Sequence, residues 1–297
     1  MEPQNIKKFL RGVKTNVPLK NYTTFRIGGA AEYFFTAKSK EDLMKAILAA
    51  QIYNLPFFIL GGGSNLLVSD NGFRGLVIKI QNSKFQILDS KIIAESGVLL
   101  GKLVNISASK GLTGLEEAMA IPGTIGGAIR GNTGAFGKSM ADVIKTVTVL
   151  EFSNSKFKFR IFENKDCKFD FRDSIFKRNP NLIILSAEIQ LKRGDKKDIK
   201  EKMKKYLDYR KKNHPLNFPS IGCIFKNSKN FYAGELIEKC GLKGKRIGDV
   251  KVSEKHCNFI VNLGHGTAEN VKELIKIIKQ KAKEKFNIKL EEEIELL

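Results

Sequence analysis

The sequence predicts an α+β protein. Patterns typical of strands and patterns of helical period occur in mixed order along the 297 residues and do not alternate strictly. Hydrophobic residues make up 42% of the chain, as in globular proteins, and the length suffices for one large domain or two ordinary ones. We therefore expect an α+β fold with true hydrophobic cores.

The first 111 residues contain signals for two helices and several strands. Ser39 is a predicted N-cap with Asp42 in the capping-box position, and the helix that follows ends before Pro56. A second helix is expected over residues 98–110, because Gly111 stands where helices commonly end. Short apolar or alternating runs predict strands at residues 57–60, 75–80, 85–88 and 91–94.

The rest of the chain continues this mixed pattern. Strands are predicted at residues 144–152, 156–162 and 181–191, and helices at residues 198–212 and after the cap Thr267. From residue 288 onward apolar residues alternate with glutamates, which predicts a C-terminal strand that carries Glu293. The change in composition at residues 192–212 predicts two domains, 1–196 and 197–297.

The net charge of +21 first suggests nucleic-acid binding. Residues 192–212 hold eleven Lys or Arg and four Asp or Glu, but the apolar residues there recur at helical spacing, which indicates a solvated basic helix face. Aromatic residues do not interleave with the basic ones as a base-stacking surface requires. We expect no nucleic-acid partner, and a phosphate-rich small substrate suits the charge equally well.

No apolar run approaches the roughly 18–20 residues that span a bilayer, and the first 19 residues lack the apolar core of a secretion signal. A cytoplasmic location without membrane attachment is expected. The four cysteines form no C-x-x-C pair and there are only three histidines, so we expect neither a metal site nor a disulfide framework. Three cysteines, Cys167, Cys240 and Cys257, are expected to be ordinary reduced thiols.

Two glycine-rich segments, residues 61–65 and 122–137, are the main functional signal. A backbone can approach a pyrophosphate closely only where side chains do not intervene, so two such loops suggest a dinucleotide cofactor, whereas one alone would indicate an ordinary turn. The Rossmann motif G-x-G-x-x-G is absent. Gly137-Lys138-Ser139 imitates the end of a P-loop, but Asn132 occupies the position of its first glycine.

The two loops resemble the FAD-binding loops of the p-cresol methylhydroxylase-type flavin fold. The resemblance implies a two-lobed FAD-binding domain followed by a smaller α+β substrate-binding domain. Since no histidine precedes His214, the FAD is expected to be non-covalent. The residues that carry the resemblance, and the cofactor contacts it implies, are Gly61, Gly62, Gly63, Ser64 and Asn65 in the first loop and Pro122, Gly123, Thr124, Gly126 and Gly127 in the second.

Four further segments narrow the resemblance: TTFRIGGA at residues 23–30, FRDSIFK at 171–177, PSIGCIFKN at 219–227 and LEEEI at 290–294. In this order, together with both loops, they resemble the shorter branch of the UDP-N-acetylenolpyruvoylglucosamine reductase family over nearly the whole chain. The resemblance implies NADPH-dependent, FAD-mediated reduction of UDP-N-acetylglucosamine enolpyruvate to UDP-N-acetylmuramate. This is a step in peptidoglycan precursor synthesis and so serves cell shape and division, and the enzyme is expected to be a monomer.

The family resemblance implies a role for each of three residues. Arg172 stabilises the enolate-like charge, Cys223 donates a proton to carbon, and Glu293 assists as a proton-bearing hydrogen-bond donor near the substrate carboxylate. Locally, Arg172 could instead pair with Asp173, Glu293 could lie on a solvated edge, and Cys223 could be a small buried residue. Lys226 and Asn227 are the expected substrate-binding residues, Asn227 at the diphosphate.

Two departures from the family pattern concern this site. Most members have Ser where Cys223 stands, and Tyr where Phe171 precedes the arginine. An ordinary thiol, with a pKa of about 8.5, is mainly protonated at pH 7 and gives up a proton more readily than an alcohol. A sugar or hydroxy-acid oxidase or dehydrogenase of the same superfamily is the alternative function.

Overall fold

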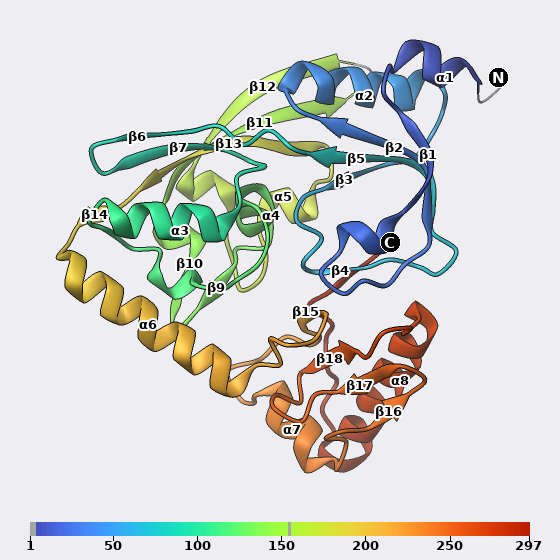
Figure 1. Ribbon diagram of the computed structural model, residues 1–297, viewed down its shortest axis with the longest axis vertical. Coiled ribbons are helices and arrows are strands. Elements are labelled where there is room, and N and C mark those ends of the chain that lie inside the picture. The colour runs from blue at the N-terminus through green and yellow to red at the C-terminus, as the bar shows by residue number, and fades with distance from the viewer. Residues whose placement is uncertain (1–3, 154–155) are drawn as a thin grey trace. The chain divides into compact units, whose positions relative to one another are not determined.

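The computed structural model describes residues 4–153 and 156–297 (Figure 1), so the first three residues of the N-terminal stretch lie outside it. Residue contacts divide the chain into two compact units. Unit 1 holds the described residues of Met1–Lys14, Phe34–Gly62 and Gly75–Asp208. Unit 2 holds Thr15–Tyr33, Gly63–Arg74 and Tyr209–Leu297. The units follow contacts and assign no ligand, so the division into a FAD-binding part, 1–196, and a substrate-binding part, 197–297, stays a prediction.

An antiparallel sheet of five strands forms the centre of unit 1, in the order β12-β11-β13-β7-β6. Two helices, α3 (Leu100–Ser109) and α4 (Ile125–Arg130), pack against it and share its core, which includes Leu103, Ile129 and Ile189 (Figure 1). The strands are β6 (Phe85–Leu88), β7 (Lys91–Glu95), β11 (Ile144–Ser153), β12 (Lys156–Glu163) and β13 (Leu182–Gln190). All five predicted strands in this region are confirmed.

A further sheet brings the end of β3 (Phe57–Leu60) beside β5 (Phe73–Ile80). These strands are parallel, with Leu60 opposite Lys79, and β2 (Ala30–Ala37) lies on the other side of β5. The preceding helix α2 (Lys40–Ile52) begins as predicted, because the Ser39 hydroxyl accepts a hydrogen bond from the Asp42 N–H at 3.1 Å. The first glycine loop therefore starts where a parallel strand ends.

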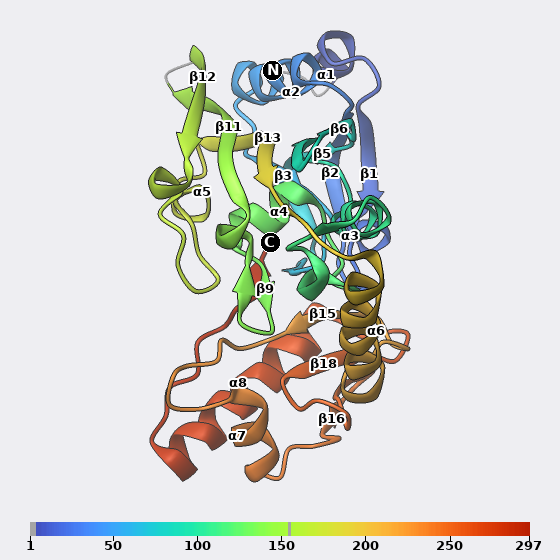
Figure 2. The ribbon, with the colours of Figure 1, turned by 90° about the vertical axis from the view of Figure 1, so that its left-hand side faces the viewer.

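The basic helix α6 (Lys196–Asn213) confirms the helix predicted for residues 198–212 (Figure 2). The boundary between the two units falls within it, after Asp208. The remaining elements of unit 1 are short. Gly111 has a φ of 70° and follows α3 closely, as predicted. The short elements are α1 (Gln4–Phe9), α5 (Ile175–Arg178), β8 (Leu112–Thr113), β9 (Gly134–Ala135), β10 (Lys138–Ser139) and β14 (Lys192–Arg193).

Unit 2 contains an antiparallel sheet in the order β15-β18-β17-β16, against which the long helix α8 (Ala268–Phe286) packs (Figures 1 and 2). As predicted, Thr267 caps α8 by accepting from the Asn270 N–H at 3.1 Å. The other elements are β1 (Lys14–Pro18), β4 (Leu66–Leu67), β15 (Ser220–Cys223), α7 (Ala233–Lys239), β16 (Arg246–Ile247), β17 (Val250–Val252), β18 (Phe259–Asn262) and β19 (Glu295–Leu296).

Two N-terminal segments help to build unit 2. Phe25, Ile27 and Leu67 belong to the same core as the apolar residues of α8 and β18. The buried Asn262 side chain donates to the Phe25 carbonyl at 3.0 Å. Unit 2 is therefore not built from one contiguous stretch of the sequence.

The predicted C-terminal strand is largely wrong. Only Glu295–Leu296 forms a strand, paired in parallel with β4, and Glu293 lies in an irregular segment beside it. The backbone here pairs with two different neighbours, since Glu293 N–H donates to Ile224 O at 2.8 Å and Glu295 N–H donates to Asn65 O at 3.0 Å. Leu296, expected on the apolar side, is 54% exposed.

The mixture of helices with antiparallel and parallel strands confirms the α+β class. Among the described residues, no helix combines the length and the apolar character needed to cross a membrane.

Candidate active site

The start of the first glycine loop, Gly61 and Gly62, lies beside the second glycine loop in unit 1. A Cβ atom on Gly62 would lie 2.6 Å from the Gly123 Cα, and one on Gly61 would lie 2.9 Å from the Thr124 Oγ1. Neither position has room for a side chain, so glycine at both positions lets the two loops approach each other closely. Closely approaching bare backbone is what a pyrophosphate needs, and these residues fit the expected FAD.

The second loop contains a short helix that its glycines did not predict. Thr124 begins α4, its hydroxyl accepting from Gly127 N–H at 3.4 Å. Gly126 lies against Ser96. A Cβ atom added to Gly126 would lie 2.8 Å from the Ser96 Cβ. Pro122 immediately precedes this arrangement. The second loop is thus packed on the central sheet of unit 1 and is not a free surface turn.

The segment that imitates a P-loop is a β-hairpin. Strands β9 and β10 pair Ala135 with Lys138, and the two residues between them, Phe136 and Gly137, both have positive φ values, 53° and 79°. Such a two-residue turn returns the chain directly and makes no phosphate-binding loop ahead of a helix. The structure agrees with the exclusion of a P-loop.

Lys79 is a residue of this region that the sequence interpretation missed. Its amine donates to the carbonyl of Gly61, and burial lowers the pKa of this amine. Leu60, the last residue before the loop, is its partner across the parallel β3–β5 pair. A lysine in the apolar run 76–80 was the available signal. Lys79 fixes the start of the first loop and brings a positive charge to it.

The first loop continues into unit 2. Gly63 has a φ of 62°, and a Cβ on it would lie 2.1 Å from the Tyr22 carbonyl oxygen. Ser64 and Asn65 follow, and the Asn65 amide donates to the Glu293 carbonyl at 3.1 Å. A predicted cofactor loop and a predicted catalytic residue are therefore joined within unit 2.

Arg172 occupies a tight turn in unit 1. Asp170 and Asp173 exchange two backbone hydrogen bonds, of 3.0 and 3.2 Å, across Phe171 and Arg172. Arg172 has a φ of 56°, a conformation that costs a non-glycine residue on the order of 1 kcal/mol and is typical of functional positions. Asp173 binds the side chain of Arg178, so its carboxylate has a partner other than Arg172.

A β-bulge positions Cys223 in unit 2. Ser220 faces Val261 and Cys223 faces Phe259, so β15 has one residue more than β18 over this stretch. Gly222 within the bulge has a φ of 83°, which favours glycine. Bulges redirect side chains and are common beside active sites. Cys223 is half-buried, so it does not fit the alternative interpretation as a small, fully buried residue.

Backbone pairing brings Cys223 and Glu293 together. Phe225 pairs with Glu292, and the carbonyl of Ile224, next to Cys223, accepts from the Glu293 N–H at 2.8 Å. The buried Asn258 anchors this pair, accepting from Phe225 N–H at 2.9 Å and donating to Phe225 O at 2.8 Å. Two of the three predicted catalytic residues thus share one small region of unit 2.

The predicted substrate-binding residues have structural partners. Lys226 lies 3.5 Å from a carboxylate oxygen of Glu291. The side-chain oxygen of Asn227 accepts from the Ala233 N–H at 3.0 Å, at the first residue of α7. These bonds hold the segment in place, and a role in binding substrate stays a prediction for both. Arg172 belongs to unit 1, so its action together with Cys223 and Glu293 also stays a prediction.

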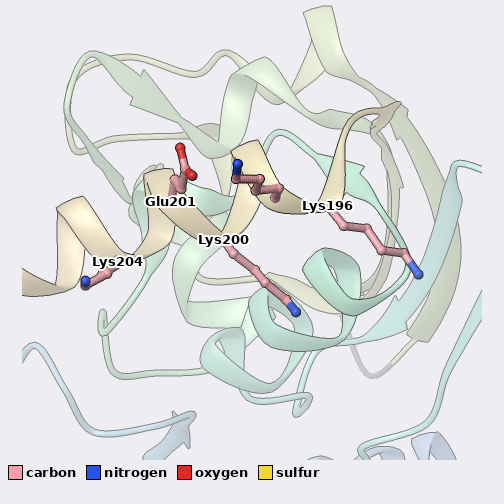
Figure 3. Close-up of a pocket in the computed structure, with 5 residues that line it drawn as sticks. Lys196, Lys200, Glu201 and Lys204 are labelled. Carbon is pink, nitrogen blue, oxygen red and sulfur yellow. The ribbon is translucent and has the colours of Figure 1, made fainter.

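A pocket of about 430 Å³ along α6 contains none of the predicted site residues. Figure 3 shows the side chains that line it, which all extend from this one helix: Lys196, Lys197, Lys200, Glu201 and Lys204. It is an open basic surface of the helix.

Two family models match separate parts of the chain. Residues 31–156 match a family described as FAD binding domain, and residues 214–297 match the family UDP-N-acetylenolpyruvoylglucosamine reductase, C-terminal domain. A solvent-stable cholesterol oxidase, 14% identical over 65% of this chain and 40% of the oxidase, with a TM-score of 0.50, shares the fold only.

Much stronger similarity extends over the whole chain. UDP-N-acetylenolpyruvoylglucosamine reductase of Caldanaerobacter subterraneus subsp. tengcongensis is 44% identical over 95% of this chain and 92% of its own length. The protein of the same name from Clostridioides difficile is 37% identical over 96% and 93%. The crystal structure of the reductase from Thermus caldophilus matches 96% of this chain and 98% of its own, with 36% identity and a TM-score of 0.82. The chain therefore belongs to the UDP-N-acetylenolpyruvoylglucosamine reductase family.

Proposed function

We propose that this protein reduces UDP-N-acetylglucosamine enolpyruvate to UDP-N-acetylmuramate, with bound FAD and with NADPH as the source of reducing equivalents. The observation that most supports the proposal is the pairing of the Cys223 segment with the Glu293 segment in unit 2. A thiol and a carboxyl group near each other suit the protonation of an enolate, and an oxidase that removes hydride from an alcohol has no need of them.

FAD would be held by the bare backbones at Gly61, Gly62, Gly123 and Thr124, and when bound it would supply hydride for the terminal carbon of the enolpyruvyl double bond. Lys79 offsets negative charge at the first loop through its amine, which stays fixed on the Gly61 carbonyl. The contact between Gly62 and Gly123 keeps the two loops at one spacing, so the cofactor binds to a preformed site.

The side chains act on the other half of the reaction. Arg172 stabilises the negative charge that develops on the substrate carboxylate, a contribution of several kcal/mol in comparable sites. The Cys223 thiol gives its proton to the carbon beside the carboxylate and takes one from solvent afterwards. Glu293 in its protonated form donates a hydrogen bond to the same carboxylate. Lys226 and Asn227 bind the diphosphate of the substrate.

We further propose that the protein acts in the cytoplasm as a monomer, in the synthesis of peptidoglycan precursors and hence in cell-wall growth, cell shape and division. The steady-state test follows NADPH consumption by the purified yellow protein in the presence of UDP-N-acetylglucosamine enolpyruvate. We expect a product two mass units heavier than the substrate, formed in equal amount to the NADPH oxidised. NADPH consumption without this product, or product formation by protein from which FAD has been removed, contradicts the proposal.

A further inference from the structure

We propose that Asn132 is a positioning residue for Arg172. Its side chain connects the second glycine loop to the turn of residues 170–173, here called the arginine turn. This inference rests on the proposed function, because it concerns the charge-stabilising role of Arg172. Asn132 stands three residues after Ile129 and belongs, like Arg172, to unit 1.

Both polar ends of the Asn132 side chain are used in the protein interior. The residue is 7% exposed. Its amide nitrogen donates to the Asp170 carbonyl at 2.9 Å, and its amide oxygen accepts from the Ala141 N–H at 3.0 Å. Its φ of 41° is a left-handed conformation that Asn tolerates better than most residues. The side chain therefore links two segments that are distant in sequence, and nothing in its own local structure requires it to do so.

A second bond ties the other side of the same turn. The fully buried hydroxyl of Ser174 donates to the carbonyl of Arg130, the last residue of α4, at 2.7 Å. Asp170 and Ser174 flank the turn that carries Arg172, and both are thus held by residues 130–132. Phe171 within the turn is 53% exposed, but the flanking Phe169 and Phe176 pack in the core of unit 1. The two hydrogen bonds act together with this packing to fix where the turn of Arg172 begins.

Residues 130–132 belong to the second glycine loop. α4 runs from Ile125 to Arg130, contains the predicted cofactor-binding residues Gly126 and Gly127, and with six residues is about 9 Å long. A short helix thus connects the predicted cofactor-binding backbone to the bonds that hold the turn of Arg172. Asn132 transmits the position of that helix to Arg172.

Loss of the Asn132 amide donor should therefore affect one half of the reaction. A displacement of about 1 Å at a catalytic group can cost roughly 100-fold in rate. Arg172 stabilises charge on the enolpyruvyl substrate, so its displacement slows transfer to that substrate. Reduction of the flavin by NADPH develops no such charge and should not change.

The test uses Asn132→Asp, which keeps the oxygen facing Ala141 N–H and replaces the donor toward Asp170 O by an acceptor. The matched control is Asn164→Asp, since the Asn164 amide donates to two backbone carbonyls of unit 1, Ala141 at 2.8 Å and Ile144 at 2.7 Å, without contacting the arginine turn. FAD dissociation constant, Tm and both half-reactions are measured for each by fluorescence, thermal denaturation and anaerobic stopped flow.

For Asn132→Asp we expect flavin reduction by NADPH and the FAD dissociation constant within about twofold of wild type, and reoxidation by the enolpyruvyl substrate about 10- to 100-fold slower. Asn164→Asp should lower Tm without slowing flavin reoxidation selectively. Ser174→Ala, which removes the second bond, should show the same selective loss and serves if Asn132→Asp does not fold. Equal slowing of both half-reactions, or slowing that follows loss of FAD, overturns the inference.

A double-mutant cycle separates positioning from general stability. If Asn132 acts through Arg172, adding Asn132→Asp to Arg172→Ala leaves the already slow reoxidation rate unchanged within about twofold. A further loss of 10-fold or more in that background refutes the inference. Failure of wild-type protein to be reoxidised by the enolpyruvyl substrate would instead reject the proposed function, so the two results are distinguishable.

Discussion

The two units hold their predicted catalytic residues in different ways. In unit 1, side chains hold the arginine turn, through the bonds of Asn132 and Ser174 to backbone carbonyls. In unit 2, backbone pairing holds Cys223 and Glu293, and Asn258 is the buried side chain that supports it. The geometry around Arg172 should thus be sensitive to neighbouring side chains, whereas that around Cys223 should tolerate many neighbouring substitutions.

The largest effect is expected for Cys223→Ala. Removal of the thiol leaves the backbone pairing with the Glu293 segment intact, so the loss reports proton donation alone and should be about 10²–10⁴-fold in reoxidation of the flavin by substrate. Cys223→Ser should keep substantial activity. The control is Cys240→Ala, another half-buried thiol of unit 2. Normal turnover by Cys223→Ala would remove the thiol from the mechanism.

Arg172→Ala should lower the same rate by about 10²–10³-fold, because the developing carboxylate charge loses its cation. Arg178→Ala removes an equal charge a few residues away, where it pairs with Asp173, and should change the rate only severalfold. Single-turnover kinetics at saturating substrate measures both. Comparable losses in the two variants would mean that the turn needs positive charge in general and not the Arg172 guanidinium.

Gly62→Ala tests the loop contact of unit 1. The new methyl group would have to displace the Gly123 backbone, so FAD affinity should fall at least 10-fold, with a less yellow purified protein. Gly101→Ala is a matched glycine substitution in the same unit, where a Cβ meets no atom within 4 Å. Its FAD dissociation constant, obtained by titrating the apoprotein, should equal that of wild type. Unchanged affinity in Gly62→Ala would contradict the assignment of the loops.

The smallest effect concerns acid stability, and it should arise in unit 2, because all three histidines lie there and unit 1 has none. Burial, together with the charge of Arg210 and the neighbouring His256, lowers the pKa of His214 from its ordinary 6.5 to about 4. The rings of His214 and His256 are 5.4 Å apart. Below pH 6.5 the unfolded chain binds a proton that the folded chain does not, so stability decreases as the pH falls from about 6.5 to about 4.

This prediction is tested by measuring Tm as a function of pH for the wild type and His214→Phe. The variant keeps an aromatic ring beside His256 and Phe259 but cannot be protonated, so its Tm should fall less steeply over this range. Identical slopes for the two proteins would show that His214 does not contribute to the pH dependence.

Local patterns predicted the elements well and their partners poorly. The Ser39 and Thr267 caps, the long strands and the basic helix follow from side-chain periodicity, which the sequence displays directly. The two-residue pairing of the C-terminus with β4 could not be predicted, because a single strand pattern does not reveal that its backbone changes neighbours. The grouping of Phe25 and Leu67 with the C-terminal core likewise depends on long-range contacts.

The candidate site shows the same limit. Motif order identified Arg172, Cys223 and Glu293, but not the residues that hold them. Asn132 was noticed only as the residue in place of a P-loop's first glycine, and its bond to Asp170 joins residues 38 positions apart. Lys79 stands in an apolar strand. The parallel register places it opposite Leu60, where its amine reaches the Gly61 carbonyl. Supporting residues of this kind follow from the tertiary structure, where their partners become neighbours.

The most direct test of the proposed reaction is an anaerobic stopped-flow experiment in two steps. The flavin of the wild-type protein is first reduced with one equivalent of NADPH, which should bleach its absorbance. UDP-N-acetylglucosamine enolpyruvate is then added, with UDP-N-acetylglucosamine and a simple hydroxy acid as parallel controls. We predict rapid return of the oxidised flavin spectrum with the enolpyruvyl substrate alone, and UDP-N-acetylmuramate in equal amount. A flavin that stays reduced with the enolpyruvyl substrate would contradict the account.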